Sequence, residues 1–186
     1  MERLDIYNEQ QLRQVLDRFE RQVMWAVEFS VKQHLKEETK KTVYATKPVL
    51  YERSYDFLNS ISSNTLYRNG KYACNIFFDT NKMSASKGVF AKNVNGKMVN
   101  VVYGKHTNNK GEDVRDRLVM YLEEGVRGSR PYAYTVSSKK AGLHMYKPRP
   151  GSHMVKNTRQ WLSESMVPIV LDAASGIWDN QIFVSR

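Results

Sequence analysis

A helical pattern near the N-terminus constrains this chain most. Asn8 with Gln11 three residues later forms a capping box, the signature of a helix start. A stripe of mostly apolar side chains follows at helical spacing: Leu12, Leu16, Phe19, Val23, Ala26 or Val27, Ser30 and Leu35. The pattern predicts a helix over about residues 8–41, about 50 Å long at about 1.5 Å per residue. Such a helix is longer than a compact domain of this size can cover, so part of it must overhang.

Two aromatic side chains lie off this stripe. Trp25 and Phe29 are one helical turn apart and define a second face of the predicted helix. One interpretation is that they are a subunit interface, most simply with another copy of the chain. The other is that a C-terminal helix covers both rings within the monomer.

Two Asn-Gly pairs, Asn69-Gly70 and Asn95-Gly96, indicate β-hairpins, because this dipeptide suits the tight turn between twisted antiparallel strands. The expected strands are 65–68, 71–78, 89–94 and 97–103. Residues 81–88 between the hairpins read as a mobile loop. Two hairpins predict a small, mainly antiparallel sheet of about four strands.

The segment 51–61, YERSYDFLNSI, joins the helix to this sheet. Its apolar positions Tyr51, Tyr55, Leu58 and Ile61 recur every three or four residues, which indicates a short helical turn with one buried face. Leu58 and Ile61 are expected to be buried where the long helix crosses the sheet. Arg53 is expected to pair locally.

The C-terminal part adds two helices. Asp113 can cap a short helix that runs to Glu124 and stops at Gly125. A second helix starts near Ser152 and should be kinked by Pro168, which removes one backbone hydrogen bond. Residues 180–186 read as a loose tail.

These elements predict one α+β domain over residues 1–186. A long N-terminal helix and a kinked C-terminal helix would pack on the small antiparallel sheet. An extended basic loop over about 126–150 would separate the two C-terminal helices of this domain.

Positive charge is concentrated in the middle of the chain. The whole chain carries a formal charge of +10, and residues 80–163 hold sixteen Lys or Arg against five Asp or Glu. The basic residues of the loop are Arg127, Arg130, Lys139, Lys140, Lys147 and Arg149, and tyrosines 132, 134 and 146 lie among them. Such a segment, extended over 127–159, can bind nucleic acid through phosphate contacts and stacking. A solvated basic loop, or one that docks on an acidic neighbouring subunit, explains the segment equally well.

Candidate catalytic groups are sparse. The four histidines, at positions 34, 106, 144 and 153, show no zinc-ligand spacing. Cys74 lies in an apolar strand pattern and is interpreted as a buried structural thiol. Glu52, Asp56 and Asp79 offer only a weak metal-nuclease hypothesis. We therefore expect no enzyme activity, no metal and no cofactor.

No run of about eighteen apolar residues is present, so no membrane association is expected. A start that lacks a positively charged segment leading into an apolar core also argues against a signal peptide. The protein is expected to be made in a cytoplasm.

Three blocks in fixed order resemble small structural proteins of tailed phages. YERSYDFLNSI is similar to an Arg-Thr-Gly-x-Leu-x-x-Ser-Ile block, with Ser54 where Thr is usual and Tyr55 where Gly is often found. MYLEEGVRG resembles a Leu-Glu-x-Gly block, and YKPRPGSHMVKNTRQWL an Arg-Pro-x-(His/Phe) start of a C-terminal helix. The matching positions are Tyr51, Arg53, Leu58, Ser60, Ile61, Glu123, Glu124, Gly125, Pro150 and His153. The family comprises neck, head-tail joining and tail-completion proteins, including relatives of the lambda tail protein Z.

The resemblance implies a virion protein at the neck or upper tail. It would form a homo-oligomeric ring between a connector or portal-associated ring and the tail tube or its terminator, with DNA passing through. Basic residues would then line the channel or contact a neighbouring ring. Contacts of positive charges with phosphates do not depend on base sequence, so DNA of any sequence could pass. On this interpretation Arg53 and Glu123 or Glu124 are structural ion-pair candidates.

Overall fold

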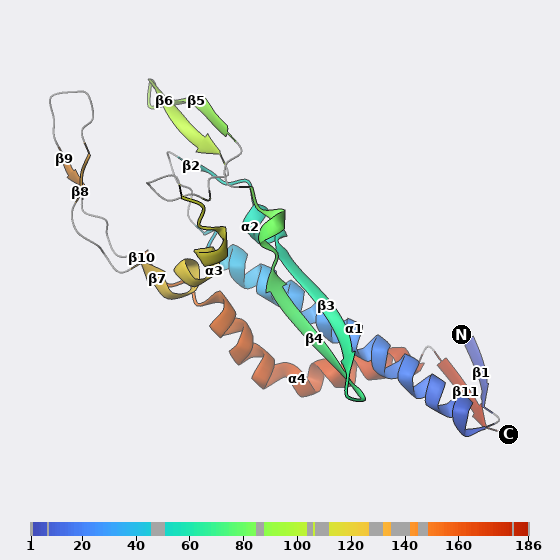
Figure 1. Cartoon of the computed structure of the whole chain (residues 1–186). Coiled ribbons are helices and arrows are strands. Elements are labelled where there is room, and N and C mark those ends of the chain that lie inside the picture. The colour runs from blue at the N-terminus through green and yellow to red at the C-terminus, as the bar shows by residue number, and fades with distance from the viewer. Residues whose placement is uncertain are drawn as a thin grey trace.

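Two long helices, α1 (Glu9–Thr42) and α4 (Met154–Asp179), form the spine of the chain (Figure 1). The computed structural model describes residues 2–6, 8–45, 51–84, 88–103, 106, 112–126, 132–134, 142–144, 149–179 and 181–185. One hairpin lies against α1 and the other projects from this spine, and both ends of the chain lie at the same end of it.

Helix α1 begins as its capping box predicts. The Asn8 side chain accepts a hydrogen bond from the backbone N–H of Gln11 at 2.9 Å, which satisfies one of the free donors of the first turn. The buried residues of α1 are Val27, Val31, Leu35 and Thr39. Leu12 and Leu16 remain 43% and 47% exposed, so the first turns of the apolar stripe form the overhang.

Helix α4 packs antiparallel to α1. Near its start the Thr39 hydroxyl, which donates to the Leu35 carbonyl at 2.7 Å, lies 3.5 Å from the Met154 sulfur, and His34 stacks on Trp161 with ring centroids 3.8 Å apart. Near its end Trp178 meets the edge of Phe19. Pro168 lies inside α4, and the helix bends along its length (Figure 1), as predicted from the missing hydrogen bond.

The two predicted hairpins are present. The strands are β3 (Ile61–Arg68), β4 (Lys71–Phe78), β5 (Gly88–Val94) and β6 (Lys97–Tyr103). Both turns use left-handed backbone, with φ of 52° and 74° at Asn69-Gly70 and 53° and 80° at Asn95-Gly96. This geometry matches the twist of the flanking strands.

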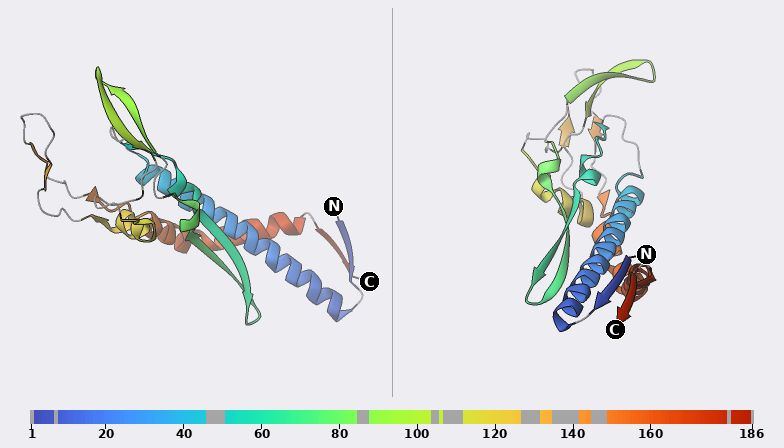
Figure 2. Two further views of the ribbon diagram at one scale, coloured as in Figure 1. Left: turned by 45° about the horizontal axis from the view of Figure 1, so that its top comes forward. Right: turned by 90° about the vertical axis from the view of Figure 1, so that its right-hand side faces the viewer.

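The hairpins do not join into one four-stranded sheet. Strands β3 and β4 pair only with each other, whereas β5 and β6 form a separate sheet with the short parallel strand β2 (Tyr51–Glu52). Figure 2 shows β5 and β6 extending away from the helices, whereas β3 and β4 run beside α1, where the Tyr72 hydroxyl donates a hydrogen bond to Asp17 at 2.6 Å. The α+β class is thus confirmed, with the four predicted strands divided between two small sheets.

The remaining elements are α2 (Asp56–Asn59), the 3-10 turn η1 (Thr80–Lys82), α3 (Arg115–Glu124), β7 (Gly125–Val126), β8 (Tyr132–Tyr134), β9 (Gly142–His144) and β10 (Arg149–Pro150).

Three loop predictions need correction. The tail is not loose over its whole length, because β11 (Gln181–Ser185) pairs in parallel with β1 (Glu2–Ile6). The basic loop contains two short antiparallel pairs, β8 with β9 and β7 with β10. The mobile loop expected at 81–88 starts instead in η1 and has Met83 only 2% exposed, while its residues 85–87 lie outside the described residues.

The segment 51–61 is not one helical turn. It starts as β2, passes through Tyr55 at a φ of 59° into the single turn α2, and ends at Ile61, the first residue of β3. Tyr55 is 51% exposed, which contradicts its predicted burial, whereas Leu58 at 7% and Ile61 at 2% are buried as predicted. They belong to the main core cluster of Leu35, Val43, Phe57, Leu58, Ile61, Met83 and Met154.

Replacing Met154 by Ala should lower the free energy of unfolding by about 2–5 kcal/mol, because it leaves a cavity in the core. Met98→Ala is the matched control, since Met154 is 0% and Met98 67% exposed. The control should change stability by less than about 0.5 kcal/mol. Urea unfolding followed by circular dichroism measures both, and equal losses would show that Met154 is not a core residue.

Candidate functional site

The three sequence blocks converge at one place, here called the block junction: residues 53–61, 122–125 and 150–155. Its centre is the end of α3 against the start of α4. The Glu123 carboxylate accepts one hydrogen bond from the backbone N–H of Val155 and one from that of Lys156, both at 2.9 Å. It therefore caps a helix that begins far away in sequence, where a negative charge also suits the helix dipole.

The backbones of the second and third blocks also touch. Ser152 donates its N–H and its hydroxyl to the Leu122 carbonyl at 2.7 and 2.8 Å. A Cβ added at Gly151 would lie 2.1 Å from the Glu123 carbonyl oxygen, so only glycine fits there. Gly125 ends α3 with a φ of 80°, as predicted, and pairs with Pro150.

The first block supplies the apolar side of the junction. Leu58 and Ile61 share the core cluster with Met154, the first residue of α4. Ser60 is fully buried and donates its hydroxyl to the Phe57 carbonyl at 2.7 Å. The first and third blocks are therefore held together by apolar packing.

Arg53 packs locally, on an aromatic ring. Its guanidinium carbon lies 5.0 Å from the centroid of Tyr44, and Tyr55 stacks on the same ring at 4.8 Å. The Tyr44 hydroxyl in turn accepts a hydrogen bond from the Leu58 N–H at 3.3 Å. This cluster joins the end of α1 to α2, and the cation–π contact supports it.

Other predicted motif positions occupy the rim of the junction or neighbouring strands. Tyr51 lies in β2, paired with Val102 of β6. His153 is exposed and adopts a φ of 53° directly before α4. Glu124 is exposed, so of the two acidic candidates it is Glu123 that has the structural role. That role is to cap a helix.

Most of the predicted basic surface cannot be placed. Arg127, Arg130, Lys139, Lys140 and Lys147 lie outside the described residues, and of Arg149 only the backbone in β10 is described. The proposed contact of these side chains with DNA or with a neighbouring ring stays a prediction.

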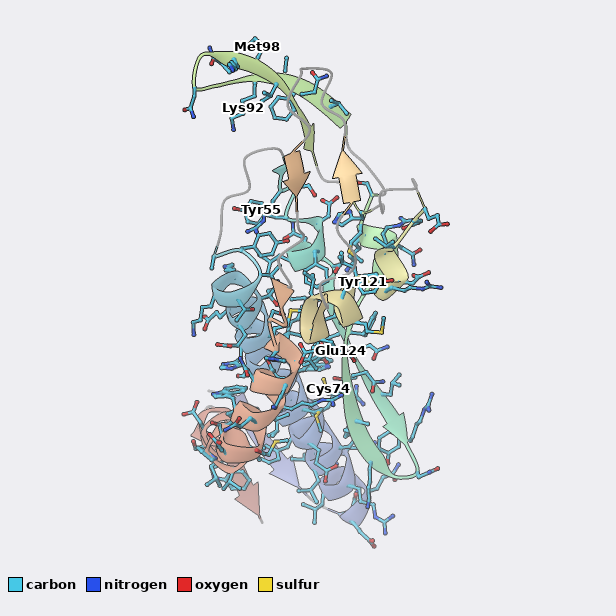
Figure 3. The ribbon with its side chains drawn as sticks, turned by 90° about the vertical axis from the view of Figure 1, so that its left-hand side faces the viewer. Tyr55, Cys74, Lys92, Met98, Tyr121 and Glu124 are labelled. Atoms are coloured by element: carbon cyan, nitrogen blue, oxygen red, sulfur yellow. The ribbon has the colours of Figure 1, made fainter. Side chains whose placement is uncertain are left out.

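An apolar groove of about 780 Å³ runs between α1, β4 and α4. Sequence reasoning missed it, although alternation along β4 places Tyr72, Cys74 and Ile76 on one face. Figure 3 shows Cys74 between the hairpin and the helices. The residues lining it from the helices include Phe19, Glu20, Val23, Met24, Val27, Glu28, Val31, Leu162, Met166, Val170 and Ala174.

Trp25 and Phe29 lie outside this groove. They are 56% and 63% exposed, so the interpretation that the C-terminal helix covers both rings is wrong. Two large aromatic side chains one turn apart therefore present an open apolar surface on α1.

The carboxylates of the nuclease hypothesis have local partners. Asp56 accepts a hydrogen bond from the Ser84 hydroxyl at 3.0 Å, and Asp79 caps η1. The Glu52 side chain is not described. Within the described ranges, no three His, Cys, Asp or Glu side chains form a group that could hold a metal. A search of the same residues finds no helix long and apolar enough to span a membrane.

Cys74 is half-buried in the groove. Burial raises the pKa of its thiol to about 11, and the neighbouring Glu28 carboxylate adds to this effect. Desolvation acts to raise the pKa of Glu28 as well, but hydrogen bonds from Ser63 and Thr65 outweigh it and lower that pKa. Cys74 is therefore a protonated, weakly nucleophilic thiol at neutral pH, which agrees with a structural role.

Glu123→Ala should lower the free energy of unfolding by about 1–2 kcal/mol, because two N–H groups of α4 lose their acceptor. Glu124→Ala removes the same charge from an exposed neighbour and should cost less than about 0.5 kcal/mol. Chemical unfolding of both variants gives the comparison. Equal stabilities would refute the capping role.

The rate of Cys74 alkylation by iodoacetamide should rise with pH to a midpoint near 11, since only the thiolate reacts. Glu28→Gln should move this midpoint to lower pH, because the raised pKa depends partly on the Glu28 charge. Protein unfolded in urea serves as the control and should titrate near the ordinary thiol value of about 8.5. An unchanged midpoint in Glu28→Gln would show that this carboxylate does not act on the thiol.

Neither a family model, nor a curated protein, nor a solved structure matches this chain.

Proposed function

We propose that this chain is a non-enzymatic structural protein of a phage virion. It forms a homo-oligomeric ring of the head-tail connector, between a connector or portal-associated ring and the tail tube or its terminator. The observation that carries the proposal is the block junction, in which the three blocks of the resemblance meet through the Glu123 cap and the Met154 core. Short motifs matched by chance would have no reason to converge.

Backbone geometry adds support within the blocks. Tyr55 stands where the resembled family often has glycine, and its φ of 59° is a left-handed value that glycine adopts without strain. Gly125 ends α3 at a φ of 80°, and Gly151 has no room for a Cβ. The block pattern thus agrees with the backbone that these positions require.

The balance of buried and exposed apolar residues favours assembly. Within the described part of the chain, nine hydrophobic side chains are buried and fifteen large ones are exposed. The β5–β6 hairpin projects from the spine with Lys92 and Met98 on it (Figure 3). Among the described residues, only Val102 and Tyr103 of this hairpin pair with a third strand, β2, so most of it is a two-stranded ribbon that packing against a neighbour would stabilise.

The charge distribution fits a DNA channel. The excess of Lys and Arg over residues 80–163 includes Lys92 and Lys97 on the exposed β5–β6 hairpin. Phosphate contacts that ignore base sequence would let any genome pass. Localisation in the virion follows from the same proposal.

Sedimentation velocity over a range of micromolar concentrations tests the proposal. We expect one closed oligomer of defined mass, because repeated copies of one interface close into a ring. The fraction of monomer should fall as concentration rises. A chain that stays monomeric at every concentration, even with neck partner proteins present, would contradict a ring subunit.

The alternative is a nucleic-acid-binding protein that uses the segment 127–159. It predicts binding that weakens steeply with salt and is lost when Lys139, Lys140, Lys147 and Arg149 are replaced by Ala. A monomer that binds DNA in this way would favour the alternative. A ring that forms without DNA would favour the connector.

A further inference from the structure

We propose that the subunit contact of the ring is head to tail. The exposed pair Trp25 and Phe29, here called the aromatic knob, inserts into the apolar groove of the next copy. This inference rests on the proposed function, because it names the partner of the knob as a second copy of the chain. The position, size and charge of the knob and the groove support a second copy of the chain as the occupant of the groove.

The knob and the groove lie on opposite sides of the same helix. Val27 and Val31 line the groove at 7% and 8% exposure, whereas Trp25 and Phe29 are 56% and 63% exposed. Successive helical residues are rotated by about 100°, so a two-residue offset places side chains on nearly opposite faces. Two different surfaces on opposite sides of one subunit make heterologous contacts, which close into a ring when the rotation permits.

The knob and the groove lie at the same level along α1. Along α1 the groove extends from Phe19 to Val31, and Trp25 is the midpoint of that range. Rotation about a ring axis moves a residue round the ring without changing its height. If α1 runs along that axis, the knob of one copy arrives at the middle of the next copy's groove.

The groove has room for the knob. Its volume of about 780 Å³ lies within the roughly 300–1,000 Å³ of pockets that enclose drug-sized ligands. Large aromatic side chains bury about 150–250 Å² each and dominate many interfaces. Neighbouring exposed residues of α4, Val167 and Leu171, can extend the apolar contact beyond the groove.

Charges beside the two surfaces are complementary. Arg18 is seven residues before Trp25, and Glu20 is seven before Val27, so each shares a helix face with that residue. Both are exposed, and neither has a hydrogen-bond or ion-pair partner among the residues described. When neighbouring copies in a ring lie at the same level, Arg18 of one copy lies beside Glu20 of the next. A two-fold contact of knob on knob would instead bring two Arg18 side chains together.

Two complementary kinds of variant test the contact, one that alters the knob and one that alters the groove. The first, Trp25→Glu with Phe29→Glu, changes only exposed side chains and removes the knob. The second blocks the groove by Ala174→Phe, and Glu20→Arg is a further groove variant that leaves the apolar packing intact. Phe77→Glu is the control, because Phe77 is a 41% exposed aromatic residue that does not line the groove.

Native mass spectrometry should show rings for the wild type and for Phe77→Glu. The knob variant and each groove variant alone should be monomeric, while an equimolar mixture of one knob and one groove variant should give a one-to-one dimer. That mixture retains one intact knob-in-groove contact per pair, whereas a two-fold contact of knob on knob would leave no pair of intact knobs between the two variants. Combining Arg18→Glu with Glu20→Arg should restore the ring.

The outcomes separate this inference from the proposed function. Rings that persist in the knob variant would overturn the inference and leave the connector proposal standing. Monomeric variants whose mixture stays monomeric would overturn it in favour of a two-fold contact. A wild type that never assembles would contradict both the head-to-tail contact and the connector proposal.

Cross-linking locates the contact directly, because Cys74 is the chain's single cysteine and lines the groove. Phe29→Cys places a second thiol on the knob, and oxidation should yield a ladder of disulfide-linked multimers. Phe77→Cys should give no ladder, nor should Phe29→Cys combined with Cys74→Ser. A ladder of equal strength in either control would overturn the assignment.

Discussion

The Glu123 cap is the interaction on which the rest of the structure depends. One carboxylate satisfies two N–H groups at the start of α4 and thereby fixes α3 against it. The first residue of α4, Met154, is then held fully buried in the core with Leu58 and Ile61. Without the cap, α4 would begin with free donors beside an apolar core, which is costly. The antiparallel course of α4 along α1, and with it the groove, follows from this anchoring.

The sequence predicts the elements well because their signals are local. The Asn8 cap, the Asn-Gly turns and the Gly125 stop each act within a few residues, and each is found where predicted. Pairing between distant segments leaves no such signal. The parallel pair β1–β11 and the separation of the two hairpins therefore could not be predicted.

In the candidate site, too, local sequence signals predict some residues, whereas others depend on contacts between distant segments. Burial of Leu58 and Ile61 follows from helical spacing, but the left-handed Tyr55 interrupts that spacing and its ring stacks on Tyr44 instead. The sequence identifies Glu123 only as an acidic motif residue, because its two N–H partners lie 32 and 33 residues later in the chain. The groove needs three elements at once, and no single stretch of sequence specifies it.

A small core at the block junction and large exposed apolar surfaces along the spine suit a subunit that is completed by its neighbours. Negative-stain images of the purified protein at micromolar concentration test this central claim most directly. A ring subunit of the connector should appear as uniform rings with a central channel wide enough for duplex DNA. Isolated elongated particles in every field would contradict it.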